Sequence, residues 1–423
     1  MTLAVRSRLV TWLAAAVLGR APGFAALAPL DDWTRQEIPG ETRGLRAIRR
    51  LDDRFWILPE GSGLHTSVDG TTWTEVSTGL SHPVQDLAAG DGRLVALVRV
   101  VDAMGNLGQT ILISTNLGAA WTRLDLTVPQ PARTVFLLEG ISHGHGQFWA
   151  VGSAASGTRQ RAPVVQTSPD GIVWRRLAER EHEGAFTWIS PYGDDWLLGG
   201  AGAPGGGLLE LRSGLQPDDH QRLRAPFRGA LVSLANGAPA TVVLDAFGDR
   251  VLRGETGVTN WVEVPLPEAG APGDGIRVAY AHGVYLLLTL HGMFSSLDAI
   301  HWHRRTLPAT PVLRDLVAGP DSWLAVGDQG TILRSGEFTR PWIALNIGDA
   351  PAGNPPPHLQ AGGARNRQLH VESSEDLRSW RTWRIATNTY GAVDLGPWNT
   401  RANHEFLRIR ESSWQAARRQ PDL

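Results

Sequence analysis

The stretch Trp323–Trp342, WLAVGDQGTILRSGEFTRPW, decides the fold. It contains an apolar run, a Gly-rich turn, a second run and a polar hairpin that ends on a tryptophan. Short apolar runs bounded by Gly and Asp are typical of buried strands rather than helices. Weaker copies of this unit recur along the chain, so the sequence predicts a protein built from repeated short strands.

The repeat has a period that tryptophans mark. Seven tryptophans each begin a short polar-apolar strand. They lie 40 to 53 residues apart, except for one gap of 87; they are Trp33, Trp73, Trp121, Trp174, Trp261, Trp302 and Trp342. The long gap is about two periods, so one tryptophan is missing near Asp219. A period of about 40 to 50 residues is typical of propeller blades or of helical pairs.

The interior of each repeat decides between these two architectures. Each repeat has a short apolar run directly after a tight turn, and these runs begin at Arg54, Arg93, Gln147, Asp195, Thr241, Val284 and Ser322. The runs are too short for helices and are flanked by Gly, Asn and Asp, which favour reversals. The sequence therefore predicts an all-β fold, a seven-bladed β-propeller of four-stranded blades, with a small C-terminal β module.

A hairpin motif precedes four of the tryptophans. In each copy a Ser-x-Asp or Ser-x-Asn sequence is followed by Trp; the residues are Ser67, Asp69, Trp73, Ser114, Asn116, Trp121, Ser168, Asp170, Trp174, Ser296, Asp298 and Trp302. An Asp or Asn side chain can accept the backbone N–H groups of a tight turn, and Gly tolerates the positive φ that such a turn needs. We expect the tryptophan rings to pack between adjacent blades.

These hairpins resemble the Asp-box, or bacterial neuraminidase repeat. The resemblance covers most of residues 40–346, and the WLAVGDQGTILRS sequence is similar to blades of the photosystem II stability and assembly factor propellers. It implies that the hairpins lie at the rim, so we interpret their aspartates as turn caps. Repeats four and five depart from the pattern, because residues 212–220 lack the Asp and Trp, and Glu255 replaces the Asp.

The N-terminus resembles a secretory signal peptide over residues 1–25. Arg6 and Arg8 precede an apolar run, Leu9–Leu18, that is followed by small residues. The run is shorter than the roughly 20 residues that cross a bilayer, and no later segment is long and apolar enough. We therefore expect export to the periplasm or the medium, with no integral membrane segment after cleavage.

The remaining boundaries follow from composition. We expect the propeller over residues 30–347, a Pro/Gly linker over 348–367, the small β module over 368–414 and a disordered tail over 415–423. The module is a candidate for surface attachment, for sorting or for extra packing. The strand after Trp33 is a candidate for fastening onto the last blade, with the strand at Trp342 beside it or displaced.

Composition excludes several functions. The 423 residues contain no cysteine, which excludes disulfides and thiolate metal ligands, and the net charge of -2 gives no reason to expect nucleic acid. Cofactor motifs such as a P-loop or a dinucleotide fingerprint are absent from the sequence. The pairs His143 with His145 and His301 with His303 lack a third ligand, so we expect no cofactor and no metal.

Candidate binding residues lie in long loops that we expect at one face, opposite the hairpins. The loops begin at Val101, Gly152, Ala201, Glu179 and Gln216. Function concentrates on such loops. The candidates are Arg159 and Arg161, which suit an anionic partner, and Glu181, Glu183, Asp218 and Asp219, which could form a carboxylate pair.

Three functions remain open. The leading hypothesis is an exported, non-enzymatic propeller that binds a protein partner or a surface polymer in an assembly or scaffold role. The alternative is a secreted glycan-active hydrolase with a carboxylate pair on the loop face, and the third is a structural surface protein. A sialidase is disfavoured, because its Arg-Ile-Pro stretch is missing and Tyr280 and Tyr285 lie in apolar strands. An apolar or Arg-rich mouth would favour binding, whereas two convergent carboxylates would favour hydrolysis. We assign no catalytic residue, and the sequence leaves the oligomeric state open.

Overall fold

The structure is a computed structural model. It describes residues 29–101, 107–125, 135–155, 161–177, 183–202, 206–216, 219–223, 229–237, 240–254, 260–267, 275–309, 311–346, 358–375, 377–397 and 406–413. The chain divides into two compact units. One consists of residues 34–280 and 285–334, and the other mainly of residues 335–423, with 281–284 and the segment up to Trp33.

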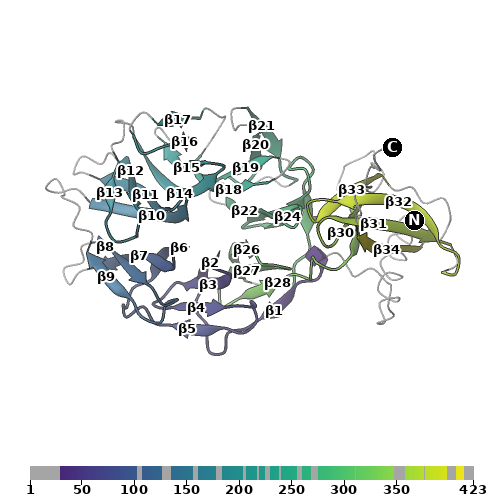
Figure 1. The fold of residues 1–423 in the computed structure, drawn as a ribbon, viewed down its shortest axis with the longest axis horizontal. Coiled ribbons are helices and arrows are strands. Elements are labelled where there is room, and N and C mark those ends of the chain that lie inside the picture. Colours follow the sequence, from purple (N-terminus) through teal and green to yellow (C-terminus); the bar gives the residue numbers. More distant parts are fainter. Residues whose placement is uncertain are drawn as a thin grey trace, which may run out of the picture. The chain divides into compact units, whose positions relative to one another are not determined.

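The larger unit is a seven-bladed β-propeller of four-stranded antiparallel sheets, which confirms the predicted fold (Figure 1). In the first six blades the strands pair in chain order from the centre of the ring outward. Blades one to three are β2 (Leu45–Leu51), β3 (Arg54–Pro59), β4 (Leu64–Ser67) and β5 (Thr74–Val76); β6 (Val84–Gly90), β7 (Arg93–Val101), β8 (Leu107–Ser114) and β9 (Thr122–Asp125); and β10 (Val135–Gly144), β11 (Gln147–Ala155), β12 (Arg161–Ser168) and β13 (Arg175–Arg176).

Blades four to six follow the same order. They are β14 (Gly184–Tyr192), β15 (Asp195–Gly202), β16 (Gly207–Arg212) and β17 (His220–Arg222); β18 (Leu231–Asn236), β19 (Thr241–Asp245), β20 (Arg250–Gly254) and β21 (Trp261–Pro265); and β22 (Gly275–Ala281), β23 (Val284–Thr289), β24 (Gly292–Ser296) and β25 (His303–Arg305). The apolar runs singled out in the sequence form the second strand of every blade, which is flanked on both sides within its sheet.

The last blade is closed by the N-terminal strand. Its first three strands are β26 (Leu313–Ala318), β27 (Trp323–Gly327) and β28 (Ile332–Arg334). Strand β1 (Thr34–Gln36), which follows the short 3-10 helix η1 (Pro29–Asp31), pairs antiparallel with β28 and supplies the fourth. The strand after Trp33 therefore fastens onto the last blade. This pairing covers the free edge of β28 and joins the two ends of the ring.

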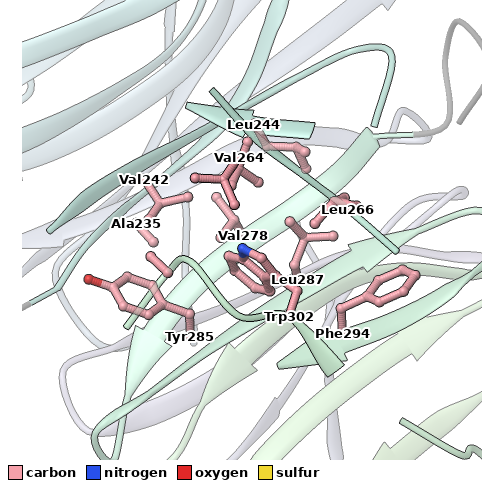
Figure 2. Packing of buried hydrophobic residues seen from close by; sticks show 12 residues of the cluster. Ala235, Val242, Leu244, Val264, Leu266, Val278, Tyr285, Leu287, Phe294 and Trp302 are labelled. Carbon is pink, nitrogen blue, oxygen red and sulfur yellow. The ribbon is translucent and has the colours of Figure 1, made fainter. Parts of the chain in front are cut away.

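The hydrophobic core consists of separate clusters between neighbouring blades. The cluster of blades five and six contains Leu244 and Val264 from one blade and Leu287, Phe294 and Trp302 from the other (Figure 2). In four further interfaces a tryptophan just before or at the start of the fourth strand packs against the core; these are Trp73, Trp121, Trp174 and Trp261. In blade four, where the repeat lacks its tryptophan, Leu215 packs at the corresponding interface.

The hairpins before the tryptophans, which we call the Ser-x-Asp hairpins (67–73, 114–121, 168–174 and 296–302), share a cap in which the Asp or Asn Oδ1 accepts the Ser hydroxyl and one or two backbone N–H groups of the turn. Asp69 Oδ1 accepts the backbone N–H groups of Thr71 and Thr72, each at 2.8 Å, and the hydroxyl of Ser67 at 2.9 Å. These backbone donors hold the pKa of Asp69 well below its usual range. The carboxylate therefore accepts hydrogen bonds from the turn that it caps.

The C-terminal module contains two three-stranded sheets. One has the order β29-β30-β33 and the other β32-β31-β34. Their bounds are β29 (Trp342–Asn346), β30 (His358–Gly362), β31 (Arg367–Ser374), β32 (Arg381–Asn388), β33 (Ala392–Pro397) and β34 (Phe406–Ser413). Leu359, Leu369, Leu395 and Ile409 form its core.

Two expected boundaries are corrected here. Strand β29, which we expected within the propeller range 30–347, pairs with β30 of the module instead. Strand β30 itself lies in the stretch 348–367, which we predicted to be a linker. Its backbone pairs with β29 on one side and β33 on the other, so pairing between distant segments outweighs the Pro/Gly composition.

Candidate functional site

Strand direction defines two ends of the propeller. Antiparallel strands alternate in direction, so the first-to-second turns and the third-to-fourth hairpins of each blade share one end. We call this end the hairpin face, because it carries the Ser-x-Asp hairpins. The second-to-third loops and the connections between blades lie at the other end, which we call the loop face.

The predicted loop residues do not all share one face. Arg161 begins β12 and Glu183 precedes β14, so both lie at the loop face, and both are exposed. Asp219 instead lies in the β16–β17 turn, at the hairpin face. Arg159, Glu181 and Asp218 lie outside the described residues. The grouping of Asp219 with Glu183 was therefore wrong, because the connection at Gln216 joins the third and fourth strands of a blade.

Asp219 caps its own turn. Its Oδ2 atom accepts the backbone N–H of Gln216 at 2.8 Å, and its carbonyl accepts the N–H of Ser213 at 2.9 Å. Asp219 thus caps its turn with a side-chain oxygen, as the aspartates of the Ser-x-Asp hairpins do. The capping residue, however, lies at the opposite end of the turn. The described part of the chain thus does not bring the predicted carboxylates together.

The structure instead places a charged cluster on the inner strands of five blades, with one further member, Arg99, on the second strand β7 of blade two. We call the residues Arg46, Arg49, Asp86, Arg99, Glu139, Arg277 and Asp315 the inner arginine cluster. They come from blades six, seven, one, two and three, and their contacts run from one blade to the next. Most of them lie near the start of an inner strand, which is the end of the strand toward the loop face.

Arg49 is the centre of this cluster. Its Nε atom lies 3.0 Å from Asp86 Oδ1 and its Nη1 atom lies 2.7 Å from Asp315 Oδ2. Asp315 Oδ1 also lies 3.4 Å from Nε of Arg277. Burial opposes the charged form of Arg49, but the two carboxylates outweigh it and raise the pKa of the guanidinium. Arg49 is therefore held as a fixed cation.

The two aspartates also join the blades through the backbone. Asp86 Oδ2 accepts the N–H of Ile141 in blade three, and Asp315 Oδ2 accepts the N–H of Ile48 in blade one, each at 3.0 Å. In blade five the hydroxyl of Ser233 accepts the N–H of Val278 at 3.1 Å. At three blade interfaces, a side chain on the inner strand of one blade therefore accepts a backbone N–H of the next blade.

Two arginines of the cluster have weaker charge compensation. Arg46 donates through Nη2 to the carbonyls of Val84 and Gln85, which are neutral acceptors. Arg277 has its side chain 32% exposed and approaches only Asp315 among the described residues. Burial lowers the pKa of both guanidinium groups. An anion beside them would therefore be bound favourably.

β-bulges shape this region. In six blades the pairing of the first and second strands skips one residue near the start of the inner strand; the skipped residues are Arg46, Gln85, Glu139, Thr187, Val232 and Arg314. A bulge leaves a residue unpaired and redirects its side chain. The signal in the sequence was a charged residue inside an otherwise apolar first strand, and we had looked for sites only in loops.

One histidine of each pair lies beside a single carboxylate. His143 Nε2 lies 3.1 Å from Asp91 Oδ2, and His301 Nδ1 lies 2.7 Å from Asp298 Oδ2. Among the described residues, no group of three or more His, Asp or Glu side chains could hold a metal ion. Within the same residues, no helix is long and apolar enough to cross a membrane.

Comparison with known proteins supports the fold. No family model matches the sequence, and no curated protein matches it. Among solved structures, YCF48 from Cyanidioschyzon merolae is 14% identical with a TM-score of 0.54, and the alignment covers 72% of this chain and 99% of that one. YCF48 bound to a D1 peptide gives 12% identity, a TM-score of 0.53, and coverage of 74% and 97%.

An enzyme shares the same architecture. Virginiamycin B lyase from Staphylococcus aureus is 12% identical with a TM-score of 0.55, and the alignment covers 72% of this chain and 98% of that one. Identities this low show a common fold and no more. The chain is thus a seven-bladed β-propeller, similar in fold both to YCF48 and to virginiamycin B lyase.

Proposed function

We propose that this chain is an exported, non-enzymatic β-propeller with an assembly or scaffold role. We further propose that its inner arginine cluster binds a carboxylate-bearing segment of a protein partner. The observation that carries the proposal is the uneven charge of that cluster, in which four guanidinium groups face three carboxylates. The N-terminal signal-like sequence is the support for export, and its residues lie outside the described part of the chain.

The carboxylates of the cluster are already engaged. Asp86 and Asp315 each contact Arg49 and a backbone N–H of the next blade, and Glu139 Oε1 contacts Arg99. The arginines retain further N–H donors, since a guanidinium carries five. A peptide carboxylate at Arg46 and Arg277 would supply the missing negative charge, and the planar fork of each arginine suits bidentate binding.

Two comparisons bear on this proposal. YCF48 has been captured with a D1 peptide, so a propeller of similar fold binds a polypeptide segment. Virginiamycin B lyase shows that the architecture also serves an enzyme, so the fold alone does not decide. A glycosidase would need an acid and a second carboxylate close together. Glu183 and Asp219 lie at opposite faces, and the inner carboxylates are engaged, so binding is the better-supported function.

A peptide-binding experiment tests the proposal. We would measure fluorescence anisotropy of a labelled Glu-rich peptide with the full chain, using a Gln-rich peptide of the same length as the neutral control. The double variant Arg46→Gln/Arg277→Gln should weaken binding by about tenfold or more, because each lost charged contact contributes about 1 kcal/mol.

The control variant is Arg35→Gln on the outer strand β1, where the side chain is exposed. It should change the dissociation constant by less than about twofold. Equal binding of the Glu-rich and Gln-rich peptides, or equal loss in both variants, would contradict a role for the inner arginine cluster.

A further inference from the structure

The bulges of the inner strands occupy equivalent positions around the propeller, and we call their residues the bulge ring. Six of them are the skipped residues named above. Asp315, which directly follows a skipped residue, accepts the N–H of Ile48, two positions after the skipped residue of the next blade. Ser233 accepts the N–H of Val278 in the same way, so the equivalent residue of blade six is Ile276.

The bulge ring has two arcs of different chemistry. Blades four, five and six contribute Thr187, Val232 and Ile276, which carry no charge. The other blades contribute charged or amide side chains; these are Arg314, Arg46, Gln85 and Glu139. Each arc is continuous, because its blades are consecutive in the ring (Figure 1). All seven residues are partly or fully exposed, so both arcs are open to a ligand at the loop face.

The apolar arc lies directly beside an arginine of the proposed peptide site. Ile276 and Arg277 are consecutive residues of β22, and Nε of Arg277 lies 3.4 Å from Oδ1 of Asp315 in blade seven. Val232 is half-buried and packs against the core cluster between blades five and six. Apolar surface from two neighbouring blades is therefore next to a guanidinium whose charge is incompletely compensated.

We infer that this site selects a peptide segment in which an apolar side chain lies within one or two residues of the bound carboxylate. The inference rests on the proposed function and specifies the partner of the same site. Consecutive residues of an extended chain are about 3.3 Å apart, so a carboxylate at Arg277 brings the adjoining side chains to Ile276 and Val232. An apolar side chain there removes apolar surface of both partners from water.

The same arc disfavours a uniformly polar or acidic segment. A second carboxylate or a hydroxyl placed against Val232 and Ile276 would lose hydrogen bonds to water, and these side chains offer none in return. The charged arc by itself would accept any anionic segment. The two arcs together therefore favour a segment that is acidic at one residue and apolar at the next.

The test is fluorescence anisotropy with the full chain and three labelled Gly/Ser peptides of equal length with blocked termini. The first carries one Glu-Leu pair, the second has Ser in place of the Leu, and the third has Gln in place of the Glu. We expect the Glu-Leu peptide to bind about tenfold more tightly than the Glu-Ser peptide, because only the leucine covers the apolar arc. The Gln-Leu peptide tests the carboxylate separately.

The double variant Val232→Thr/Ile276→Thr should reduce the preference for the Glu-Leu over the Glu-Ser peptide from about tenfold to about twofold. The preference for Glu over Gln should remain, since the arginines are unchanged. The matched control is Val262→Thr/Ile300→Thr, which also changes one valine of blade five and one isoleucine of blade six. These two residues are 50% and 46% exposed on the outer strand β21 and in a Ser-x-Asp hairpin, so the control should keep the full preference.

A gain of affinity tests the arc even where the double variant fails to fold. Thr187→Val extends the apolar arc into blade four with a side chain of the same shape at an exposed position. It should raise the preference for the Glu-Leu peptide by about threefold, a result that unfolding does not produce.

Two results would overturn the inference and are distinct from failure of the proposed function. Equal affinity for the Glu-Leu and Glu-Ser peptides, with weaker binding of the Gln-Leu peptide, would leave a carboxylate site without an apolar preference. Tighter binding of decanoate than of the Glu-Leu peptide would assign the arc to a fatty acid. Equal affinity for all three peptides would instead contradict the proposed function itself, and the inference with it.

Discussion

Arg49 of the first blade and Asp315 of the last blade form an ion pair across the closure of the ring. Arg49 Nη1 lies 2.7 Å from Asp315 Oδ2, and the same oxygen accepts the backbone N–H of Ile48 at 3.0 Å. The side chain of Asp315 is only 8% exposed. One carboxylate therefore joins the two ends of the propeller through both a side chain and a main chain, beside the pairing of β1 with β28.

We predict that Asp315→Ala lowers the free energy of unfolding by about 3 kcal/mol. The change leaves the N–H of Ile48 buried without its acceptor and leaves Arg49 with one carboxylate instead of two. Urea denaturation followed by tryptophan fluorescence measures the loss. Asp328→Ala, in the same blade, breaks the more exposed pair with Arg314 and should cost less than about 1 kcal/mol. Similar losses in the two variants would contradict the closing role of Asp315.

A second ionic contact near the closure gives a pH dependence. Glu41 lies in the connection from β1 to β2, and its carboxylate contacts Arg43 and, at 2.7 Å, Nε2 of His65. The hydrogen bond from Arg43 lowers the pKa of Glu41 from 4.5 to about 2. Because the folded state has the lower pKa, this stabilisation is complete above about pH 4.5 and is lost as the pH falls toward 2.

We therefore predict that Glu41→Gln destabilises the protein by about 2 kcal/mol at neutral pH and that the difference from wild type disappears between pH 4.5 and 2. Denaturation curves of both proteins across that range measure it. Glu37→Gln is the control, since the side chain is 79% exposed and lies in the same connection. A difference that persists unchanged at pH 2 would show that the carboxylate charge is not the cause.

The blade pattern could be predicted from sequence because it is local. Residues Val284–Thr289 are all buried, so nearly all of their side chains must be apolar. The same holds for residues 55–59 and for Trp323–Gly327. The hairpins could be predicted for a related reason. The turn depends on two residues that are close in sequence, the capping side chain of Asp69 and Gly70, whose φ is +74°.

The inner arginine cluster could not be predicted in this way. Arg49 and Asp315 are 266 residues apart and meet only when the ring closes. Nothing near Arg49 in sequence indicates which carboxylate will face it. Strand β30 is a similar case, because its two partner strands come from opposite sides of it in the chain. Asp219 was assigned to the wrong face because the strands that precede its loop in the blade were not counted.

The Ser-x-Asp hairpins make a prediction that separates backbone strain from packing. Gly171 has φ of +73°, and a Cβ atom there would lie 2.7 Å from Cγ2 of Val95 in the preceding blade. Gly146 has a similar φ of +69°, but a Cβ atom would meet nothing within 4 Å. Gly146→Ala should therefore cost about 1 kcal/mol for conformation alone.

Gly171→Ala should cost about 2 kcal/mol, because the contact with Val95 adds to the same conformational cost. Thermal unfolding of both variants under identical conditions measures the difference. Equal stability of the two variants would mean that blade two yields to the added methyl group. In that case the close approach of the hairpin to its neighbour would not contribute to stability.

Trp302 shows how strongly the tryptophans hold neighbouring blades together. The side chain is 6% exposed and packs with Val264, Leu266 and Val278 between blades five and six (Figure 2). We predict that Trp302→Ala lowers the free energy of unfolding by about 4 kcal/mol, because it leaves a cavity that two sheets cannot both fill. Val173→Ala is the control. Val173 is 67% exposed in a hairpin of the same kind, so its substitution should cost less than about 0.5 kcal/mol.

Because each blade contacts both neighbours in a closed ring, the loss of stability in Trp302→Ala should appear in the unfolding of the whole propeller. Faster hydrogen exchange confined to blades five and six would show instead that the blades unfold separately.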